Sequence, residues 1–472
     1  MSEPGSGGGG RASGPGGSGA ALLAAGSGAS SAAVGGLGSK AERRRAWLVT
    51  VVIVAFMVVN YADKSVLGLA AVPIMDELGL SNSTYGLISS SFYFLFSLSG
   101  LVVGFLSSRM SSRVLLFGMT LMWAVAQLPV LAFASAGTLL ASRVLLGAAE
   151  GPAASMSMHA LYKWFPAGRR GLPSALQIGG AALGTLIAAP LVTWLITAFG
   201  WRSAYATLAV VSAAWGVLWW HIGTDGPYGE GARPSKSSAP SAGAVGDGAV
   251  DGGAVDRGAM GWLPYRRVLL TGTVLGSIAS ALGAHWALTV SHAWLPVYLR
   301  TQLGMSASAA ATAISVISAF GLVLLLSVSP LMDALKSRGV SSRWSTGATQ
   351  GVAVVVAGCA MAAFPFVAAP GVRLVLVGLA FGGSAVAIPL HYMTAAEVVP
   401  AGQRGAVFGI VAAAGTLPGL VAPFLTGRLI DAGATAAQGY RVAFLVAAAV
   451  MVLFGAVAVG WIRPERDVER LS

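Results

Sequence analysis

The 472-residue chain has few charged side chains for its size. Charged residues make up 10% of the sequence, with 29 lysines and arginines and 17 aspartates and glutamates, whereas 56% of the residues are apolar. A soluble protein of ordinary composition has about a quarter of its residues charged. The composition therefore excludes a water-soluble globule and indicates an integral membrane protein.

The sequence also contains only one cysteine, Cys359, which lies in an apolar segment. A single cysteine cannot form an intrachain disulfide framework or a cysteine-based metal cluster. A His-Glu-x-x-His sequence is missing, as is a Ser/His/Asp set at one depth of the predicted membrane segments. We therefore expect neither an enzyme nor a bound metal or cofactor.

Apolar stretches of 18 or more residues fill most of the chain after residue 45. Each can cross a hydrocarbon core of about 30 Å at about 1.5 Å per helical residue. The sequence therefore predicts an all-α membrane protein with twelve transmembrane helices. Their approximate positions are 46–73, 84–107, 113–135, 138–162, 171–198, 202–223, 268–299, 307–335, 345–368, 371–393, 404–430 and 440–462.

A polar interruption divides the twelve predicted spans into six and six. Residues 224–264 are rich in Gly, Ala, Ser, Asp and Pro and show no helical period, which predicts a flexible cytoplasmic linker. It separates an N-terminal six-helix bundle (46–223) from a C-terminal six-helix bundle (265–463). Residues 1–45 have no apolar run long enough for a signal peptide and are predicted to be a disordered cytoplasmic tail. Residues 464–472 are predicted to be a C-terminal cytoplasmic tail.

The basic residues are distributed unevenly between the two sides of the predicted membrane. With the N-terminus inside, 21 of the 29 lysines and arginines fall in cytoplasmic segments and 5 on the other face. This asymmetry predicts that both termini lie in the cytoplasm. The expected location of the multi-pass protein is the plasma membrane. The asymmetry also accounts for the net charge of +12 without a nucleic-acid groove, so that the lipid bilayer, and no nucleic acid, is the expected partner.

One short motif occurs in both halves at the same topological position. The sequence PAGRRG at 166–171 returns as PAGQRG at 400–405, with five of six residues identical. Two six-helix halves in the same orientation imply a pseudo-twofold axis along the membrane normal. A cavity between the halves, near the middle of the bilayer, is expected from this arrangement.

Four ionisable residues lie well inside predicted spans, namely Asp63 and Lys64 in the first and Arg143 and Glu150 in the fourth. Each would cost about 2.5–3.5 kcal/mol if unpaired, so these groups must face one another or water. Asp63 and Glu150 lie at similar depths, and their carboxylates are expected to share one cavity. The alternative is a set of structural ion pairs that joins the two spans. Pro152 predicts a kink directly after Glu150.

The residues around these charges match known motifs. The sequence NYADKS at 60–65 is similar to an Asn-Tyr-x-Asp-Arg signature, with Lys64 in the place of arginine, and RVLLGAAEGP at 143–152 resembles the fourth-span motif of the same family. WLPVY at 294–298 and AEVVPAGQRG at 396–405 also look family-like. The chain thus resembles the anion:cation symporter family of the major facilitator superfamily from about residue 46 to 463.

This resemblance implies a major facilitator fold of two pseudo-symmetric six-helix bundles that works as a monomer. It also implies that a small organic anion, such as a sugar acid, is carried inward together with protons. Asp63 and Glu150 would be proton carriers. Lys64 and Arg143 would bind the carboxylate of the substrate or couple it to the protons.

The superfamily's loop signature, Gly-x-Leu-x-Asp-Arg-x-Gly, is only partly present. After the second span Ser108 replaces the acid next to Arg109, and Arg113 follows. The second copy keeps the acid as Asp333, followed by Arg338. Arg109, Arg113, Asp333 and Arg338 are predicted to form cytoplasmic gating contacts. The contact after the second span is expected to be weakened, because Ser108 replaces the acid there.

Several polar residues are further candidates for the substrate site. His285 and His292 are seven residues apart on one face of the seventh span, where they would line the cavity or else pack as buried or interfacial histidines. Tyr93 and Gln177 are candidates for hydrogen bonds to substrate hydroxyls, although polar residues also join helices.

Two other residues are expected to have structural roles near the cytoplasmic side. His391 is expected at the membrane interface. Glu397 is expected to pair with Arg404.

Together these features predict a secondary active transporter that imports a small organic anion with protons by alternating access. One rival is a proton-coupled exporter of drugs or metabolites with the same fold, although residues 180–190 lack the Gly-Pro-x-x-Gly-Gly element usual in exporters. A second rival is a membrane enzyme or sensor. The chain shows no catalytic constellation for the first and no folded output domain for the second.

Overall fold

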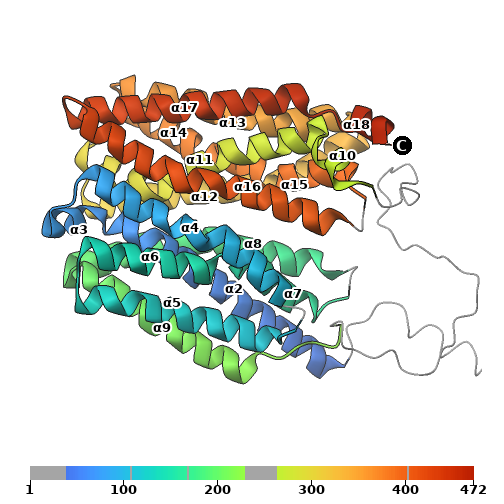
Figure 1. Cartoon of the computed structure of the whole chain (residues 1–472), viewed down its shortest axis with the longest axis horizontal. Helices are drawn as coiled ribbons and strands as arrows, with labels where there is room; N and C mark the ends of the chain where they lie inside the picture. Colours follow the sequence, from blue (N-terminus) through green and yellow to red (C-terminus); the bar gives the residue numbers. More distant parts are fainter. Residues whose placement is uncertain (1–38, 107–108, 167–168, 229–262, 401–402, 472) are drawn as a thin grey trace, which may run out of the picture.

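The computed structural model describes residues 39–106, 109–166, 169–228, 263–400 and 403–471. Within these ranges the chain is helical and contains no strand. Figure 1 shows two bundles whose helices run in the same general direction, with the first half coloured blue to green and the second half yellow to red. The expected all-helical, two-bundle architecture is confirmed. Residues 1–38 of the predicted tail and 229–262 of the predicted linker lie outside the described ranges.

The first half begins earlier than the sequence pattern predicts. Helix α2 starts at Lys40 rather than at residue 46, because Ser39 and Glu42 cap each other's backbone N–H groups in a capping box. The helices of this half are α2 (Lys40–Leu69), α3 (Ala71–Leu78), α4 (Asn82–Leu106), α5 (Ser112–Ala132), α6 (Ala136–Glu150), α7 (Ala153–Tyr162), α8 (Gly171–Phe199) and α9 (Trp201–Ile222).

The second half ends in a helix where the sequence predicts a tail. The buried carboxylate of Asp467 in this last helix accepts hydrogen bonds from the backbone N and the hydroxyl of Thr273, both at 2.7 Å. The elements of this half are α10 (Tyr265–Leu269), α11 (Gly272–Thr301), α12 (Ala307–Ser337), the π-helix Arg343–Ala348, α13 (Thr349–Ala363), the 3-10 turn Phe364–Phe366, α14 (Pro370–Gly382), the 3-10 turn Gly383–Val386, α15 (Ala387–Val398), α16 (Arg404–Ala432), α17 (Ala436–Trp461) and α18 (Pro464–Leu471).

The predicted fourth span is broken at the expected place. Eleven spans among the described helices are long and apolar enough to cross a membrane. The twelfth is divided into α6 and α7 at Gly151 and Pro152, directly after Glu150. A side chain at Gly151 would overlap the backbone oxygen of Phe96 on α4. The break therefore combines a proline, which lacks an N–H donor, with a close approach of two helices.

The two copies of the repeated motif make the same local contact. The Nε of Arg170 donates to the backbone oxygen of Phe165 at 3.0 Å, and the Nε of Arg404 donates to the backbone oxygen of Val399 at 3.3 Å. In both cases the acceptor lies five residues earlier in the chain, which agrees with an internal repeat. Residues 167–168 and 401–402 of the motif lie outside the described ranges.

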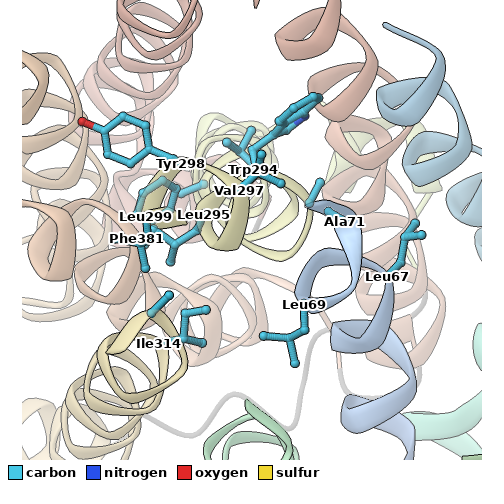
Figure 2. Packing of buried hydrophobic residues seen from close by; sticks show 14 of the residues in the cluster. Leu67, Leu69, Ala71, Trp294, Leu295, Val297, Tyr298, Leu299, Ile314 and Phe381 are labelled. Carbon is cyan, nitrogen blue, oxygen red and sulfur yellow. The ribbon is translucent and has the colours of Figure 1, made fainter. Parts of the chain in front are cut away.

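The halves pack together at the end of the molecule remote from α18, here called the distal end. They meet where α4 contacts α16, α8 contacts α12 and α2 contacts α11. One continuous apolar cluster crosses between the halves at this end. Figure 2 shows Ala71 of α3 close to Trp294 and Val297 of α11, with Leu67 and Leu69 at the end of α2 on the same side as Ala71.

At the opposite end, here called the terminal end, the two halves have separate apolar cores. Val49, Trp123 and Trp164 belong to a cluster made only of first-half residues, whereas Val268 and Val407 belong to one made only of second-half residues. The structure is therefore closed between the halves at the distal end, and the described residues form no shared apolar core between the halves at the terminal end.

Glycines allow the backbones of the two halves to approach closely at the distal end. A Cβ atom added at Gly68 of α2 would overlap the backbone oxygen of His292, and one at Gly86 of α4 would overlap that of Pro423. Gly409 lies on α16 toward the terminal end, and no atom lies within 4 Å of a Cβ built there. Small residues at helix contacts permit dense packing in a membrane, and Gly68 and Gly86 permit it between the two halves at the distal end.

A carboxylate from the second half caps a helix of the first half at the distal end. Asp431 of α16 accepts hydrogen bonds from the backbone N of Asn82 at 3.2 Å, from the Asn82 amide at 2.8 Å and from the backbone N of Ser83 at 2.7 Å. The first N–H groups of a helix have no partner within the helix and carry partial positive charge. Asp431 therefore stabilises the closed distal end.

Replacement of Asp431 by asparagine is expected to shift the protein toward a state open at the distal end. The contact is exposed and screened by solvent, so we expect a loss of about 1–2 kcal/mol, or roughly a 5- to 30-fold change in the ratio of the two states. Distances between spin labels on the two halves would measure this shift, after exposed Cys359 has been replaced by serine. Glu77→Gln is the matched control, because Glu77 pairs with Arg202 of its own half at 2.6 Å. Equal distance distributions for both variants would contradict the capping role.

Candidate functional site

A small pocket lies between the two halves and is lined by both of them. Its volume is about 20 Å³, which leaves room for about one water molecule. The lining residues are Lys64, Leu67 and Gly68 of α2, Ser89, Phe92 and Tyr93 of α4, Arg143 of α6, Thr289, His292 and Ala293 of α11, and Pro423 of α16.

Lys64 joins α2 to the end of α6. Its Nζ lies 3.7 Å from Oε2 of Glu150 and 2.9 Å from Oδ1 of Asn60, to which it donates a hydrogen bond. The Glu150 side chain is fully buried, and neither of its oxygens has a hydrogen-bond partner among the described residues. A buried carboxylate held by one cation beyond hydrogen-bond distance is poorly stabilised. Glu150 therefore depends on Lys64 for compensation of its charge within the described residues.

Arg143 presents a second cation to the same pocket. Its Nη1 donates a long hydrogen bond of 3.4 Å to the backbone oxygen of Asp63, and its guanidinium carbon lies 5.1 Å from the centre of the Phe92 ring. Its Nε has no partner, and no carboxylate in the described ranges lies within 4 Å of its nitrogens. Arg143 therefore keeps donors available for an anion that enters the pocket.

Asp63 and Glu150 do not share the pocket as the sequence suggested, because neither of them lines it. The buried carboxylate of Asp63 accepts hydrogen bonds from Nε2 of Gln127 at 2.9 Å and from the Ser212 hydroxyl at 3.4 Å, both inside the first half. Neighbouring residues of a helix face different directions. Because Lys64 faces the pocket, Asp63 faces α5 and α9. The two cations border the pocket, and neither carboxylate does.

The other predicted substrate residues divide into two groups. Tyr93 and His292 line the pocket, with the Tyr93 ring packed against Gly419 of α16. His285 lies outside the pocket lining and donates its Nδ1 hydrogen to the backbone oxygen of Ala281 at 2.9 Å.

Gln177 joins two helices of the first half instead of lining the pocket. Its amide donates hydrogen bonds to the Ser157 hydroxyl at 2.8 Å and to the backbone oxygen of Ala154 at 3.3 Å. Gln177 therefore joins helices, which was the alternative to a role in substrate binding.

The predicted gating residues lie apart from the pocket. Arg113 donates a hydrogen bond to the backbone oxygen of Trp220, and its guanidinium carbon lies 4.7 Å from the centre of the Trp220 ring. Arg109, Asp333 and Arg338 are exposed on the surface. Ser108, on which the weakened contact depends, lies outside the described ranges, so the gating role stays a prediction.

Two expectations near the terminal end are wrong. Glu397 pairs with Lys336 of α12 at 2.6 Å, whereas the Nε of Arg404 donates to a backbone oxygen of its own loop. His391 is fully buried rather than interfacial, and its ring centre lies 6.4 Å from that of His285. Spacing along the chain could not show that α12 packs beside α15 at this point.

Sequence reasoning missed four polar residues of this region. Ser89 and Thr289 line the pocket, and Gln127 and Ser212 hold Asp63. Thr289 could have been found, because it lies on the same helical face as His285 and His292. Gln127 and Ser212 each interrupt an otherwise apolar span. This interruption was the sequence signal by which they could have been found. No group of three or more metal-ligating side chains occurs in the described part of the chain.

Comparison with known proteins identifies the family. The model of the Major Facilitator Superfamily matches residues 53–423. The hexuronate transporter of Bacillus subtilis is 24% identical over 86% of this chain and 92% of its own length. The D-galactonate transporter of Escherichia coli is 26% identical over 91% of this chain and 97% of its own.

Solved structures show the same fold. A bacterial homolog of the human lysosomal transporter Spinster, in its inward-facing and unoccupied conformation, has a TM-score of 0.70 at 16% identity and covers 92% of this chain and 99% of its own. A D-xylose-proton symporter has a TM-score of 0.66 at 16% identity over 89% of this chain and 98% of its own. Because the family model matches well over half of the sequence, this chain belongs to the Major Facilitator Superfamily and is a membrane transporter rather than an enzyme.

Proposed function

We propose that this protein imports a small organic anion, such as a sugar acid, together with protons across the plasma membrane. The observation that carries the proposal is the pocket between the halves, whose described lining includes the two cations Lys64 and Arg143 and no carboxylate. The transport of hexuronate and D-galactonate by relatives that match most of the chain supports the same substrate class.

The side chains around the pocket offer suitable chemistry for a hydroxy acid, which would have to widen the volume of about 20 Å³ by moving the halves apart. A guanidinium group can hold a carboxylate through two parallel hydrogen bonds, and Arg143 has donors available for this. Hydroxyl and imidazole groups of Ser89, Thr289 and His292 can bond to hydroxyl groups of the substrate. Because these groups come from both halves, bound substrate would link the halves.

The Lys64–Glu150 pair supplies a route to proton coupling. A substrate carboxylate would compete with Glu150 for Lys64. Glu150 would then be a buried carboxylate without its cation, and protonation removes the cost of that charge. A proton moving through a potential of 100 mV contributes about 2.3 kcal/mol, or roughly forty-fold accumulation, if more protons than anion charges are carried.

Closure at the distal end supports an inward-facing arrangement. The excess of basic residues predicts that the terminal end, with both chain termini, faces the cytoplasm. Rocking of the two halves about the pocket would exchange the closed distal end for a closed terminal end. The contacts of Asp431, Gly68 and Gly86 would break in each cycle.

Arg143→Gln is expected to weaken substrate binding by roughly 30- to 150-fold, because loss of a two-point carboxylate contact removes about 2–3 kcal/mol. The measurement is uptake of labelled galactonate and hexuronates into proteoliposomes that are acidic outside. Arg43→Gln, an exposed cation away from the pocket, is the control and should behave like the parent protein. If no sugar acid or other carboxylate is taken up or raises the melting temperature, the substrate class is wrong. Substrate-driven proton movement in the opposite direction would favour the exporter.

A further inference from the structure

A groove at the terminal end lies far from the substrate pocket and has a different chemistry. It is formed where the start of α2 meets the end of α9 (Figure 1), and its volume is about 740 Å³. Its lining residues are Lys40, Ala41, Arg44, Arg45, Leu48, His221 and Ile222. Three cations and a histidine thus converge on one groove, and no described acidic side chain lines it.

Nearby acids are already engaged elsewhere. Glu42 accepts a hydrogen bond from the backbone N of Ser39 at 2.7 Å. Asp225, three residues after α9, pairs with Lys163 at 3.1 Å. Neither carboxylate forms an ion pair with a cation of the groove, so an anion can bind there without displacing an existing pair.

The groove continues into an apolar surface. On the α2 side, Leu48 is 47% exposed and Val51 is 64% exposed, one helical turn further along. On the α9 side, Trp220 is 41% exposed, next to His221 and Ile222. Tryptophan is enriched at the level of lipid headgroups, where its ring contacts both the polar and the apolar layer. Trp220 would then mark the level of the lipid headgroups, and the exposed Leu48 and Val51 give the cations of the groove an apolar neighbour on α2.

We propose that this groove binds the headgroup of an anionic phospholipid from the leaflet at the terminal end. The phosphate would contact Arg44 and Arg45, and the acyl chains would run along Leu48 and Val51. A soluble anion fits the observations less well, because it would leave the exposed apolar surface below the cations unused. Trp215 donates a hydrogen bond to the backbone oxygen of Val52 at 2.9 Å, so the two helices that form the groove are fixed to each other.

The test compares two double variants of the full chain that remove the same number of charges. Arg44→Gln/Arg45→Gln changes the groove, whereas Arg43→Gln/Arg267→Gln removes two exposed cations near the same membrane surface that do not line it. Binding of phosphatidylglycerol and of phosphatidylcholine to purified protein would be measured by native mass spectrometry. Thermal unfolding in plain detergent would show whether each variant is folded.

We expect the parent protein to prefer phosphatidylglycerol over phosphatidylcholine. The groove variant should lose about 10- to 30-fold in phosphatidylglycerol affinity, and the control variant less than about threefold. Equal losses in both variants would show attraction to surface charge in general and would overturn the proposal. If millimolar inorganic phosphate competed as effectively as the lipid, the groove would be assigned to a soluble anion instead. The result does not depend on which substrate is transported.

Discussion

Replacement of Glu150 by glutamine is expected to abolish the accumulation of substrate driven by a pH gradient, while exchange of substrate across the membrane continues. Glutamine has the shape of protonated glutamic acid and cannot release a proton. Lys64 would lose its only carboxylate partner among the described residues and would remain available to the substrate. Accumulation should therefore fall from as much as forty-fold per 100 mV to equilibrium with the outside concentration.

Two measurements on proteoliposomes separate this result from simple inactivation. Counterflow, in which labelled substrate exchanges with unlabelled substrate inside, should persist in Glu150→Gln. Glu397→Gln is the matched control, because Glu397 also pairs with a lysine, at 2.6 Å, but outside the pocket. Asp63→Asn tests the second predicted proton carrier. If Glu150→Gln accumulates substrate normally and Asp63→Asn does not, the coupling route through Lys64 is wrong.

Alanine at Gly68 or at Gly86 is expected to trap the protein with its distal end open. The added methyl group would overlap a backbone oxygen of the opposite half, and a backbone atom cannot move aside as a side chain can. Overpacking of this kind costs about 1–3 kcal/mol, which corresponds to roughly a 5- to 150-fold shift between the two states. Because both contacts lie between the halves, each six-helix bundle should still fold.

Labelling of an introduced cysteine beside the pocket, in a background without Cys359, would report this shift as faster reaction with a reagent added from the distal side. Gly409→Ala and Gly118→Ala are matched controls, because no atom lies within 4 Å of a Cβ built at either position. Gly147→Ala gives a different comparison. Its methyl group would overlap the backbone oxygen of Phe92 within the first half, so misfolding is expected there. Unchanged labelling of Gly68→Ala and Gly86→Ala would contradict an alternating closure at these contacts.

Much of the fold could be predicted because membrane burial imposes simple rules on sequence. Long apolar runs must form helices, since backbone N–H and C=O groups in lipid have no other partner. Glu150 followed by Pro152 marked the break between α6 and α7 for the same reason, since proline cannot donate a backbone hydrogen bond. The four intramembrane charges could be expected to face inward because lipid exposure is so costly.

The directions of individual side chains could not be obtained in this way. Asp63 and Lys64 are equally polar in the sequence, yet only Lys64 lines the pocket, because the rotation of α2 depends on its neighbours α8 and α11. Gln177 and Tyr93 looked like equivalent candidates, and only Tyr93 faces the other half. Glu397 paired with Lys336, which is close to it only after α12 and α15 have packed.

The amino-acid sequence by itself determined that the chain is a helical membrane protein of two related halves, with buried charges on the first and fourth spans. These properties follow from the transfer of apolar and charged groups into lipid, which depends on each residue and its near neighbours. Only the tertiary structure decided which cation faces the pocket, which acid pairs with Lys64 and at which end the halves close. Those outcomes depend on helix rotation and on close backbone contacts between residues such as Gly86 and Pro423, which lie hundreds of positions apart in the chain.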